Sequence, residues 1–395
     1  MNGIYNLCCA STWRGRRYLV SPLVDMMFAG GAAFVIVPLL FWMFPLDANG
    51  ASGYMQVYIA SVAFAFLAHI VNHPHFMASY YLMYDDFKNK IAMHRLERSH
   101  MAWRYLFAGV IVPVVLIGYL IYAFVAQDND IFAWGVYVLF FTVGWHYCKQ
   151  AFGVMLVLSA LKGVYYGRLT RRILWINAML VWFKTWLGGN LYVPNVVYQP
   201  MNYQGVSFNN LQIHITPMMM DVLNGFLWLY GGLSLLLVVY VAIKQRIRPS
   251  LCALLGYSSM YSLLLFSYYH PLWAYMTPFF HSGQYLLFVI AYKRGEHHHH
   301  IHHLHMPIEQ SRDQMKRFVG VCFIMGLLSF KGIPGTMEWL TDSHALRAVG
   351  IMLPFIYAFD IFINVHHYFI DNVLWRKDNP KVGRYLFYKT TTPSS

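Results

Sequence analysis

Histidines that could bind a metal ion are the main chemical feature of this sequence, which has 19 of them among 395 residues. Several lie four residues apart, as His69 and His73 do, and His367 lies four residues before Asp371. Residues at this spacing share one face of a helix. Two imidazoles on one face can bind a single ion, and a carboxylate can complete the ligand set or hold a histidine in its binding tautomer. The spacing therefore predicts a metal site.

The predicted ligands come from several segments of the chain that lie far apart in the sequence. They are His69, His73, His75, His146, His281, His299, His302, His303, His366, His367 and Asp371. Pro74 lies within the first of these segments, and a proline inside a helix kinks the helix axis. We expect this kink to turn His75 toward the face that carries His69 and His73.

Four further polar residues are expected close to the metal. Gln150, Gln284 and Tyr285 each follow a predicted histidine ligand by three or four residues and should line the substrate pocket. Lys149 lies inside an apolar run, where a lysine normally faces a cavity or a partner. We expect it to anchor a polar head group of the substrate.

The densest group of histidines is the stretch EHHHHIHHLH at residues 296–305. Residues 293–317, which contain it, are expected to form a His-rich cytoplasmic loop. Two interpretations stay open. The loop either captures metal ions or contributes His299, His302 and His303, which form the pattern HxxHH, as direct ligands.

The composition places these residues in a membrane protein. Only 11% of the residues are charged, against roughly 25% in a soluble domain, and 58% are hydrophobic. These values exclude a soluble globular enzyme and a disordered chain. The five cysteines contain no CxxC pair, which argues against a cysteine zinc site or a disulfide framework. We expect an all-α, polytopic membrane protein whose residues 1–395 form a single integral membrane domain.

A bilayer crossing needs about 20 mostly apolar residues, and the sequence offers about ten such segments. They are residues 24–46, 54–83, 106–125, 131–161, 173–192, 218–243, 251–269, 272–292, 318–330 and 346–370. The ninth is short, so it is either re-entrant or extends toward Trp339. Lys and Arg gather in alternate connections, as the positive-inside rule requires of the cytoplasmic side.

This alternation predicts cytoplasmic N- and C-termini and places most histidines in the cytoplasmic halves of the spans or in cytoplasmic loops. It also explains the net charge of +13. The basic residues form no single patch, so nucleic acid is not an expected partner. The expected location is a bacterial inner membrane, with the metal site toward the cytoplasm.

Three histidine patterns resemble the histidine boxes of the membrane-bound di-iron desaturases and hydroxylases. They are HxxxH at His69 and His73, HxxHH at His299, His302 and His303, and the pair His366 and His367. The chain is also similar to the multi-span bacterial carotene-cleaving oxygenases, which hold iron with membrane-embedded histidines. Both resemblances imply iron, single or di-iron, that activates dioxygen against a lipid or isoprenoid-like substrate. Zinc and copper stay open as alternatives, because imidazole and carboxylate ligands suit all three metals.

The sequence therefore predicts a metal-dependent membrane oxidoreductase. It contains no flavin, heme-attachment or dinucleotide-binding motif, so a separate electron donor is expected. Two other classes remain open. One is a transporter or metal-handling protein in which the histidine-rich stretch passes ions to the intramembrane histidines. The other is a zinc-dependent hydrolase or transferase.

Overall fold

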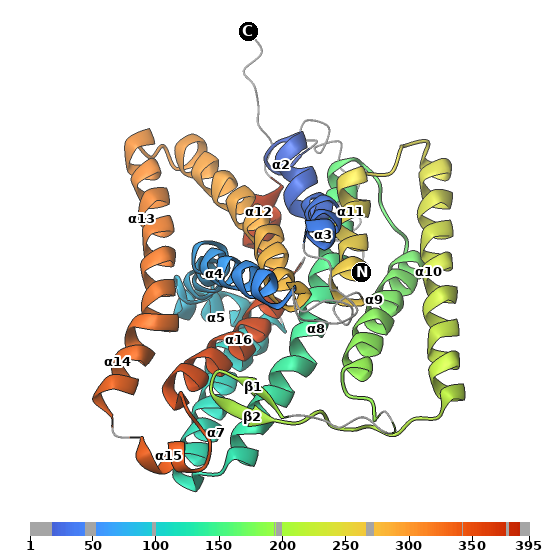
Figure 1. Ribbon diagram of the computed structural model, residues 1–395. Helices are drawn as coiled ribbons and strands as arrows, with labels where there is room; N and C mark the ends of the chain where they lie inside the picture. The colour runs from blue at the N-terminus through green and yellow to red at the C-terminus, as the bar shows by residue number, and fades with distance from the viewer. Residues whose placement is uncertain are drawn as a thin grey trace.

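The computed structural model of the chain consists almost entirely of helices (Figure 1). It describes residues 18–43, 53–96, 100–192, 194, 200–265, 272–341, 343–376 and 379–387. The elements of the first half, where η marks a π-helical segment, are α2 (Pro22–Met26), η2 (Met27–Gly31), α3 (Ala32–Met43), α4 (Gly53–Tyr84), α5 (Phe87–Leu96), α6 (Met101–Leu106), η3 (Phe107–Ile111), α7 (Val112–Ala126), α8 (Asn129–Leu161) and α9 (Arg168–Gly188).

The second half contains the two short strands and the remaining helices. These elements are β1 (Met201–Tyr203), β2 (Val206–Phe208), α10 (Pro217–Gln245), α11 (Leu251–Met260), η4 (Tyr261–Leu265), α12 (Leu272–His303), α13 (Ile308–Leu327), η6 (Leu328–Gly332), α14 (Ile333–Leu340), α15 (His344–Ala348), α16 (Pro354–Leu374) and α17 (Pro380–Leu386). The strands pair as an antiparallel hairpin, with Met201 opposite Phe208 and Tyr203 opposite Val206.

Five helical stretches within the described part of the chain are long and apolar enough to cross a membrane. They are Pro22–Leu39, Met101–Ala126, Asn129–Leu161, Pro217–Gln245 and Ile308–Leu340. Large apolar side chains on two of them are exposed: Val125 of α7 is 77% exposed and Trp228 of α10 is 80% exposed. Lipid accepts such a surface, whereas water does not. The predicted all-α architecture is confirmed, and five of its helices have the length and composition of membrane spans.

The other predicted spans fall in α4, α9, α11 with η4, α12 and α16, which are helical but are not among these five. The ninth predicted span does continue past Trp339, as one of its two alternatives required. The tenth was predicted to start too early. After α15 the chain turns at Gly350, whose φ is +91°, and α16 starts at Pro354. Glycine tolerates that backbone conformation, and proline is favoured at the first position of a helix.

Residues 293–317, which were predicted to form a cytoplasmic loop, are helical over most of their length. α12 continues to His303, and α13 already begins at Ile308. Histidine costs a helix interior only a fraction of a kcal/mol relative to alanine, so a run of histidines does not end a helix. The first strong helix breaker after the run is Pro307, which is the N-cap residue of α13.

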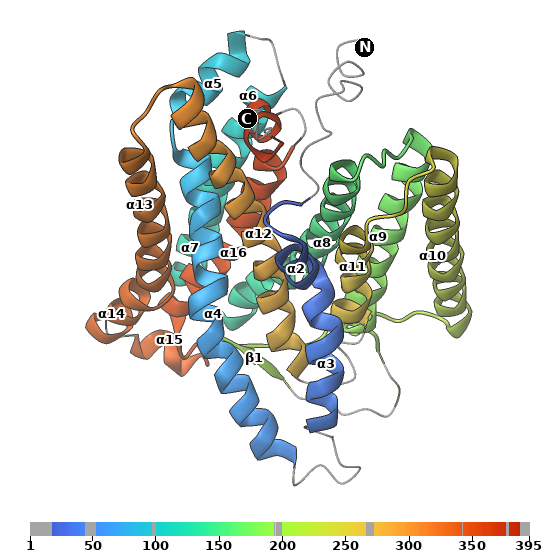
Figure 2. The same cartoon turned by 90° about the horizontal axis from the view of Figure 1, so that it is seen from above.

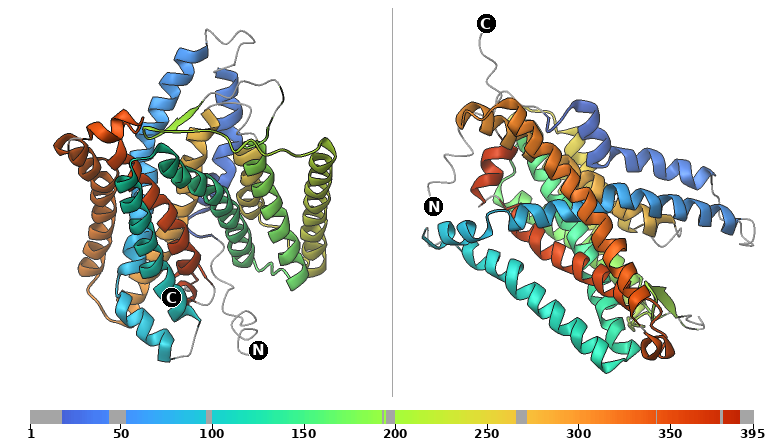
Figure 3. Two further views of the ribbon diagram at one scale, coloured as in Figure 1. Left: turned by 90° about the horizontal axis from the view of Figure 1, so that it is seen from below. Right: turned by 90° about the vertical axis from the view of Figure 1, so that its left-hand side faces the viewer.

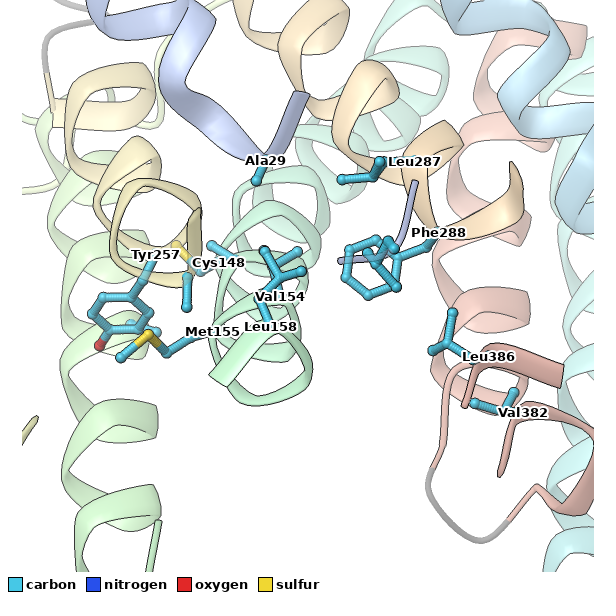
Figure 4. Packing of buried hydrophobic residues seen from close by; sticks show 14 of the residues in the cluster. Ala29, Cys148, Val154, Met155, Leu158, Tyr257, Leu287, Phe288, Val382 and Leu386 are labelled. Atoms are coloured by element: carbon cyan, nitrogen blue, oxygen red, sulfur yellow. The ribbon is translucent and has the colours of Figure 1, made fainter. Parts of the chain in front are cut away.

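Four helices, α4, α8, α12 and α16, form the centre of the molecule. α4 packs against α12, α13 and α16, while α8 packs against α9, α11 and α16. α13 lies on one side of this group and α9 and α10 lie on the other (Figures 2 and 3). Figure 4 shows part of the apolar core, in which Val154 and Leu158 of α8, Tyr257 of α11 and Leu287 of α12 belong to one buried cluster.

Two close helix contacts are made at glycine residues. A Cβ atom at Gly326 of α13 would lie 3.1 Å from the Cβ atom of His73 in α4. A Cβ atom at Gly256 of α11 would lie 2.5 Å from Cγ1 of Val154 in α8 and 3.1 Å from the backbone oxygen of Ala29. Small residues let helices approach closely inside a membrane. These two contacts therefore hold α4 and α8 against their neighbours.

α16 is fixed at its N-terminus by a side chain from α14. Oε1 of Glu338 accepts hydrogen bonds from the backbone N–H groups of Phe355 at 2.7 Å and Ile356 at 3.1 Å. These N–H groups have no partner within the helix itself. The hydroxyl of the next residue, Tyr357, donates a hydrogen bond to the carbonyl oxygen of Phe132 in α8. α16 is therefore held in a defined position beside α8.

Candidate metal centre

Four histidines and one aspartate converge in the interior from four helices. They are His75 of α4, His146 of α8, His281 of α12, and His367 and Asp371 of α16. Their ligand atoms form two groups of three that share His367, and within each group these atoms lie within 4.8 Å of one another. All five residues are buried. The sequence predicted each of them as a ligand, and the fold brings them together.

The contacts between the ligand atoms have the lengths expected for ligands of one ion. Nε2 of His75 lies 3.2 Å from Nε2 of His367, and Nε2 of His146 lies 3.1 Å from Nε2 of His281. Two nitrogens that are each about 2.1 Å from a shared ion are about 3.0 Å apart at a right angle and about 3.4 Å apart at the tetrahedral angle. The imidazole and carboxylate donors fit iron, zinc or copper.

Asp371 uses its two carboxylate oxygens differently. Oδ1 accepts hydrogen bonds from the hydroxyl of Ser79 at 2.9 Å and from the hydroxyl of Tyr285 at 3.0 Å. Oδ2 lies 3.2 Å from Nε2 of His367 and 3.7 Å from Nε2 of His146. The two hydroxyl donors orient the carboxylate and leave Oδ2 for a metal ion, which is how ligand carboxylates are commonly supported.

His75 is held in the tautomer that a metal ligand needs. Its Nδ1 atom lies 2.5 Å from the carbonyl oxygen of Asn72 and donates its proton there. The hydroxyl of Ser282 lies 2.9 Å from the same nitrogen and donates to Oδ1 of Asn72 at 2.7 Å. With the proton on Nδ1, the Nε2 atom keeps its lone pair for an ion.

Two residues that were predicted to line the pocket, Gln150 and Gln284, form a chain of hydrogen bonds beside His281. The amide of Gln150 donates hydrogen bonds to the carbonyl oxygen of His281 at 3.0 Å and to Oε1 of Gln284 at 2.8 Å. The amide of Gln284 donates in turn to the backbone oxygen of Ala29 at 2.5 Å. These amides connect α8, α12 and η2 next to the candidate centre. Their contacts are structural, in addition to any contact with a substrate.

Lys149 does not reach the five residues. Its Nζ atom donates a hydrogen bond to Oδ1 of Asn372 and lies 5.0 Å from the centroid of the Trp145 ring. His146, three residues earlier, is one of the five. Its ring stacks on that of Tyr368, with ring centroids 4.6 Å apart. The lysine is therefore hydrogen-bonded to Asn372 of α16 rather than to any of the five residues.

His69 and His73 stay outside the group of five, contrary to prediction. Their ring centroids are 4.6 Å apart, and His73 stacks on Phe330 of η6 at 4.1 Å with an angle of 6° between the rings. The prediction that Pro74 turns His75 toward them was wrong. Residues two apart on a helix point about 200° apart, so His73 faces η6 while His75 faces α16.

His366 is also not part of the group, which corrects another prediction. Its Nε2–H donates to the carbonyl oxygen of Ala108 at 2.8 Å, and its Nδ1 atom lies 2.9 Å from the hydroxyl of Tyr80. Both ring nitrogens thus have partners. Adjacent residues on a helix point about 100° apart, and the next residue, His367, is the one that faces the other ligands.

His299, His302 and His303 are too distant to join the candidate centre. His299 follows His281 by 18 residues on the same helix. Because an α-helix rises about 1.5 Å per residue, the two residues lie about 27 Å apart. The interpretation of HxxHH as a source of ligands for the same ions as His281 is therefore wrong.

Three residues that support the ligands were not predicted: Asn72, Ser79 and Ser282. Each lies within four residues of a ligand on the same helix. Ser79 follows His75 by four residues and so shares its helix face, and this spacing was the available signal. Serine and asparagine are common in any helix, whereas histidine is rare, so their types alone did not identify them.

A small apolar cavity lies against the ring of His281. Its walls include Tyr147 and Ala151 of α8, Met260 of α11 and Phe280 of α12. The cavity has a volume of about 20 Å³. Apolar cavities stay dry and accept small apolar molecules, so this one has room for a single diatomic gas molecule.

No protein-family model, curated protein or solved structure matches this chain. The geometry of the five converging residues is therefore the basis for assigning a function.

Proposed function

We propose that the protein is a metal-dependent membrane oxidoreductase in which histidine-bound non-heme iron uses dioxygen to oxidise a hydrophobic substrate. One observation carries this proposal: four buried imidazoles and one buried carboxylate meet in two groups of three that share His367, and two pairs of their Nε2 atoms lie 3.2 Å and 3.1 Å apart. A set of nitrogen and oxygen donors without thiolate suits iron chemistry.

Iron bound at this position, single or di-iron, would activate dioxygen. The residues of the chain then have distinct tasks. Ser79 and Tyr285 hold Oδ1 of Asp371 so that Oδ2 stays available. Asn72 keeps the proton of His75 on Nδ1. The surrounding apolar core excludes water, which strengthens electrostatic interactions with the ligands and protects reactive species from side reactions.

The cavity beside His281 supports the use of dioxygen. Its walls are mostly apolar, and its size suits one diatomic molecule next to a candidate ligand. We assign it as the position from which dioxygen reaches the centre. A long substrate would approach from a different side, since the cavity is too small for a lipid chain.

The proposal includes a placement in the membrane. We place the candidate centre in the cytoplasmic half of a bundle of about ten spans, with both termini cytoplasmic, in a bacterial inner membrane. The positive-inside distribution of Lys and Arg supports this orientation. The exposed apolar faces of α7 and α10 support contact with the bilayer, from which a lipid or isoprenoid-like substrate would enter. A separate electron donor supplies the reducing equivalents.

The test compares metal content among three forms of the detergent-purified protein: the native chain, His367→Ala and His73→Ala. His367 belongs to both ligand groups, while His73 is a buried histidine of α4 outside them. Elemental analysis should find iron in the native protein and in His73→Ala, and lose it in His367→Ala. The native protein should then consume dioxygen in the presence of a lipid extract and a one-electron reductant.

Each alternative gives a different result. Zinc in place of iron, with turnover that does not need dioxygen, would make the protein a hydrolase or transferase. Metal flux across proteoliposomes without any product would make it a transporter or metal-handling protein. Equal iron loss in His73→Ala and His367→Ala would contradict the assignment of ligands.

A further inference from the structure

The end of α12 presents two pairs of histidines to the surface. The ring centroids of His298 and His302 are 4.2 Å apart, and those of His299 and His303 are 5.0 Å apart. In each pair the second member is exposed and the first is partly buried. Each pair is spaced four residues apart within one continuous helix, so either could offer two imidazole nitrogens to one ion.

The surroundings of the two pairs differ in charge. The pKa of His299 is lowered by burial and then by the positive charge of Arg384 in α17. The ring of His299 also contacts that of Tyr385, with centroids 5.5 Å apart. The pKa of His298 is lowered by burial and then by neighbouring imidazoles. The positive charge of Arg384 disfavours a dication beside His299, and the rings of His298 and His302 are also the closer pair, at 4.2 Å against 5.0 Å.

We propose that His298 and His302 form a second metal site, which binds divalent transition ions such as Cu²⁺, Ni²⁺ or Zn²⁺ reversibly at the surface. Two imidazoles leave the remaining coordination positions to water, so the ion can exchange. His298 follows His281 by 17 residues, which places the pair about 26 Å along α12 from the buried centre. The proposal does not depend on the chemistry of that centre.

The probe is Cu²⁺ chelated by iminodiacetate, followed by electron paramagnetic resonance on the full-length protein in detergent. The chelator occupies part of the coordination sphere of copper and leaves positions for two imidazoles. Its bulk keeps it away from the five buried residues, so it reports on the surface pairs. The native protein should show copper coupled to two protein nitrogens.

His298→Ala should abolish this two-nitrogen signal, and His302→Ala should do the same. His299→Ala serves as the matched control because it removes a neighbouring histidine of the other pair, and it should keep the signal. His367→Ala should also keep it, which separates this result from any failure of the buried centre. Retention of the signal in His298→Ala, or its loss in His299→Ala, would overturn the proposal. Circular dichroism establishes that each variant stays folded.

Discussion

The buried histidines of the candidate centre and the histidine pairs at the end of α12 use the same residue type at related spacings, yet their surroundings differ. At the centre, Asn72 fixes the tautomer of His75, and two hydroxyls fix Asp371. At the end of α12, His302 and His303 are exposed. Spacing therefore brings ligands together, whereas the hydrogen-bonding groups around them decide whether a site is rigid and selective or open and exchangeable.

Asp371→Asn is expected to produce the largest difference between metal binding at the buried centre and metal binding at the surface pair. The amide keeps the shape and an acceptor for Ser79 and Tyr285, but it replaces the anionic Oδ2 with a neutral atom. Metal in the buried centre should fall to background in elemental analysis, while copper–iminodiacetate binding at the surface pair stays unchanged. Asp360→Asn is the control, since Asp360 lies on the same helix and accepts a hydrogen bond from Tyr203 instead. Full metal content in Asp371→Asn would remove the carboxylate from the ligand set.

A smaller loss of metal affinity is expected when the ligands are kept and the hydroxyl groups that orient Asp371 are removed. In Ser79→Ala combined with Tyr285→Phe, Oδ1 of Asp371 loses both hydroxyl donors. Loss of such outer contacts typically weakens metal binding about 10- to 100-fold, and a competition titration with a chelator would measure it. Tyr292→Phe, two turns further along α12, removes a buried hydroxyl elsewhere and should leave the affinity unchanged. Equal affinities in the double variant and the native protein would show that the two hydroxyls do not orient Asp371.

The sequence predicted the helical architecture well because long apolar runs are a strong local signal. It predicted the limits of the helices less well. Pro354 should have marked the start of α16, and the absence of a breaker before Pro307 should have extended α12 through the histidine run. Of the predicted spans outside the five apolar helices, α4, α12 and α16 carry polar residues of the candidate centre, and such residues lower the hydropathy by which a span is recognised.

The candidate ligands were predicted by type, but their selection needed tertiary contacts. His366 and His367 are equivalent in sequence, and only the position of α16 against α4 and α8 decides which one faces the other ligands. Packing also decides between His73 and His75. His73 stacks on Phe330 on one side of α4, whereas His75 contacts His367 on the other side. Rotation of a helix about its axis follows from packing, which a single sequence does not display.

The smallest expected effects are on the free energy of unfolding. They compare the hydrogen bonds beside the buried centre with the exposed end of α12. Gln284→Leu removes the donor to Ala29 and the acceptor for Gln150, which leaves buried polar groups unpaired. The free energy of unfolding should fall by about 1–3 kcal/mol, measured by the midpoint of denaturation in mixed detergent micelles. His298→Ala, on the exposed end of the same helix, should change it by less than about 0.5 kcal/mol. Equal changes in the two variants would mean that the polar contacts behind His281 contribute no more to the fold than a surface histidine does.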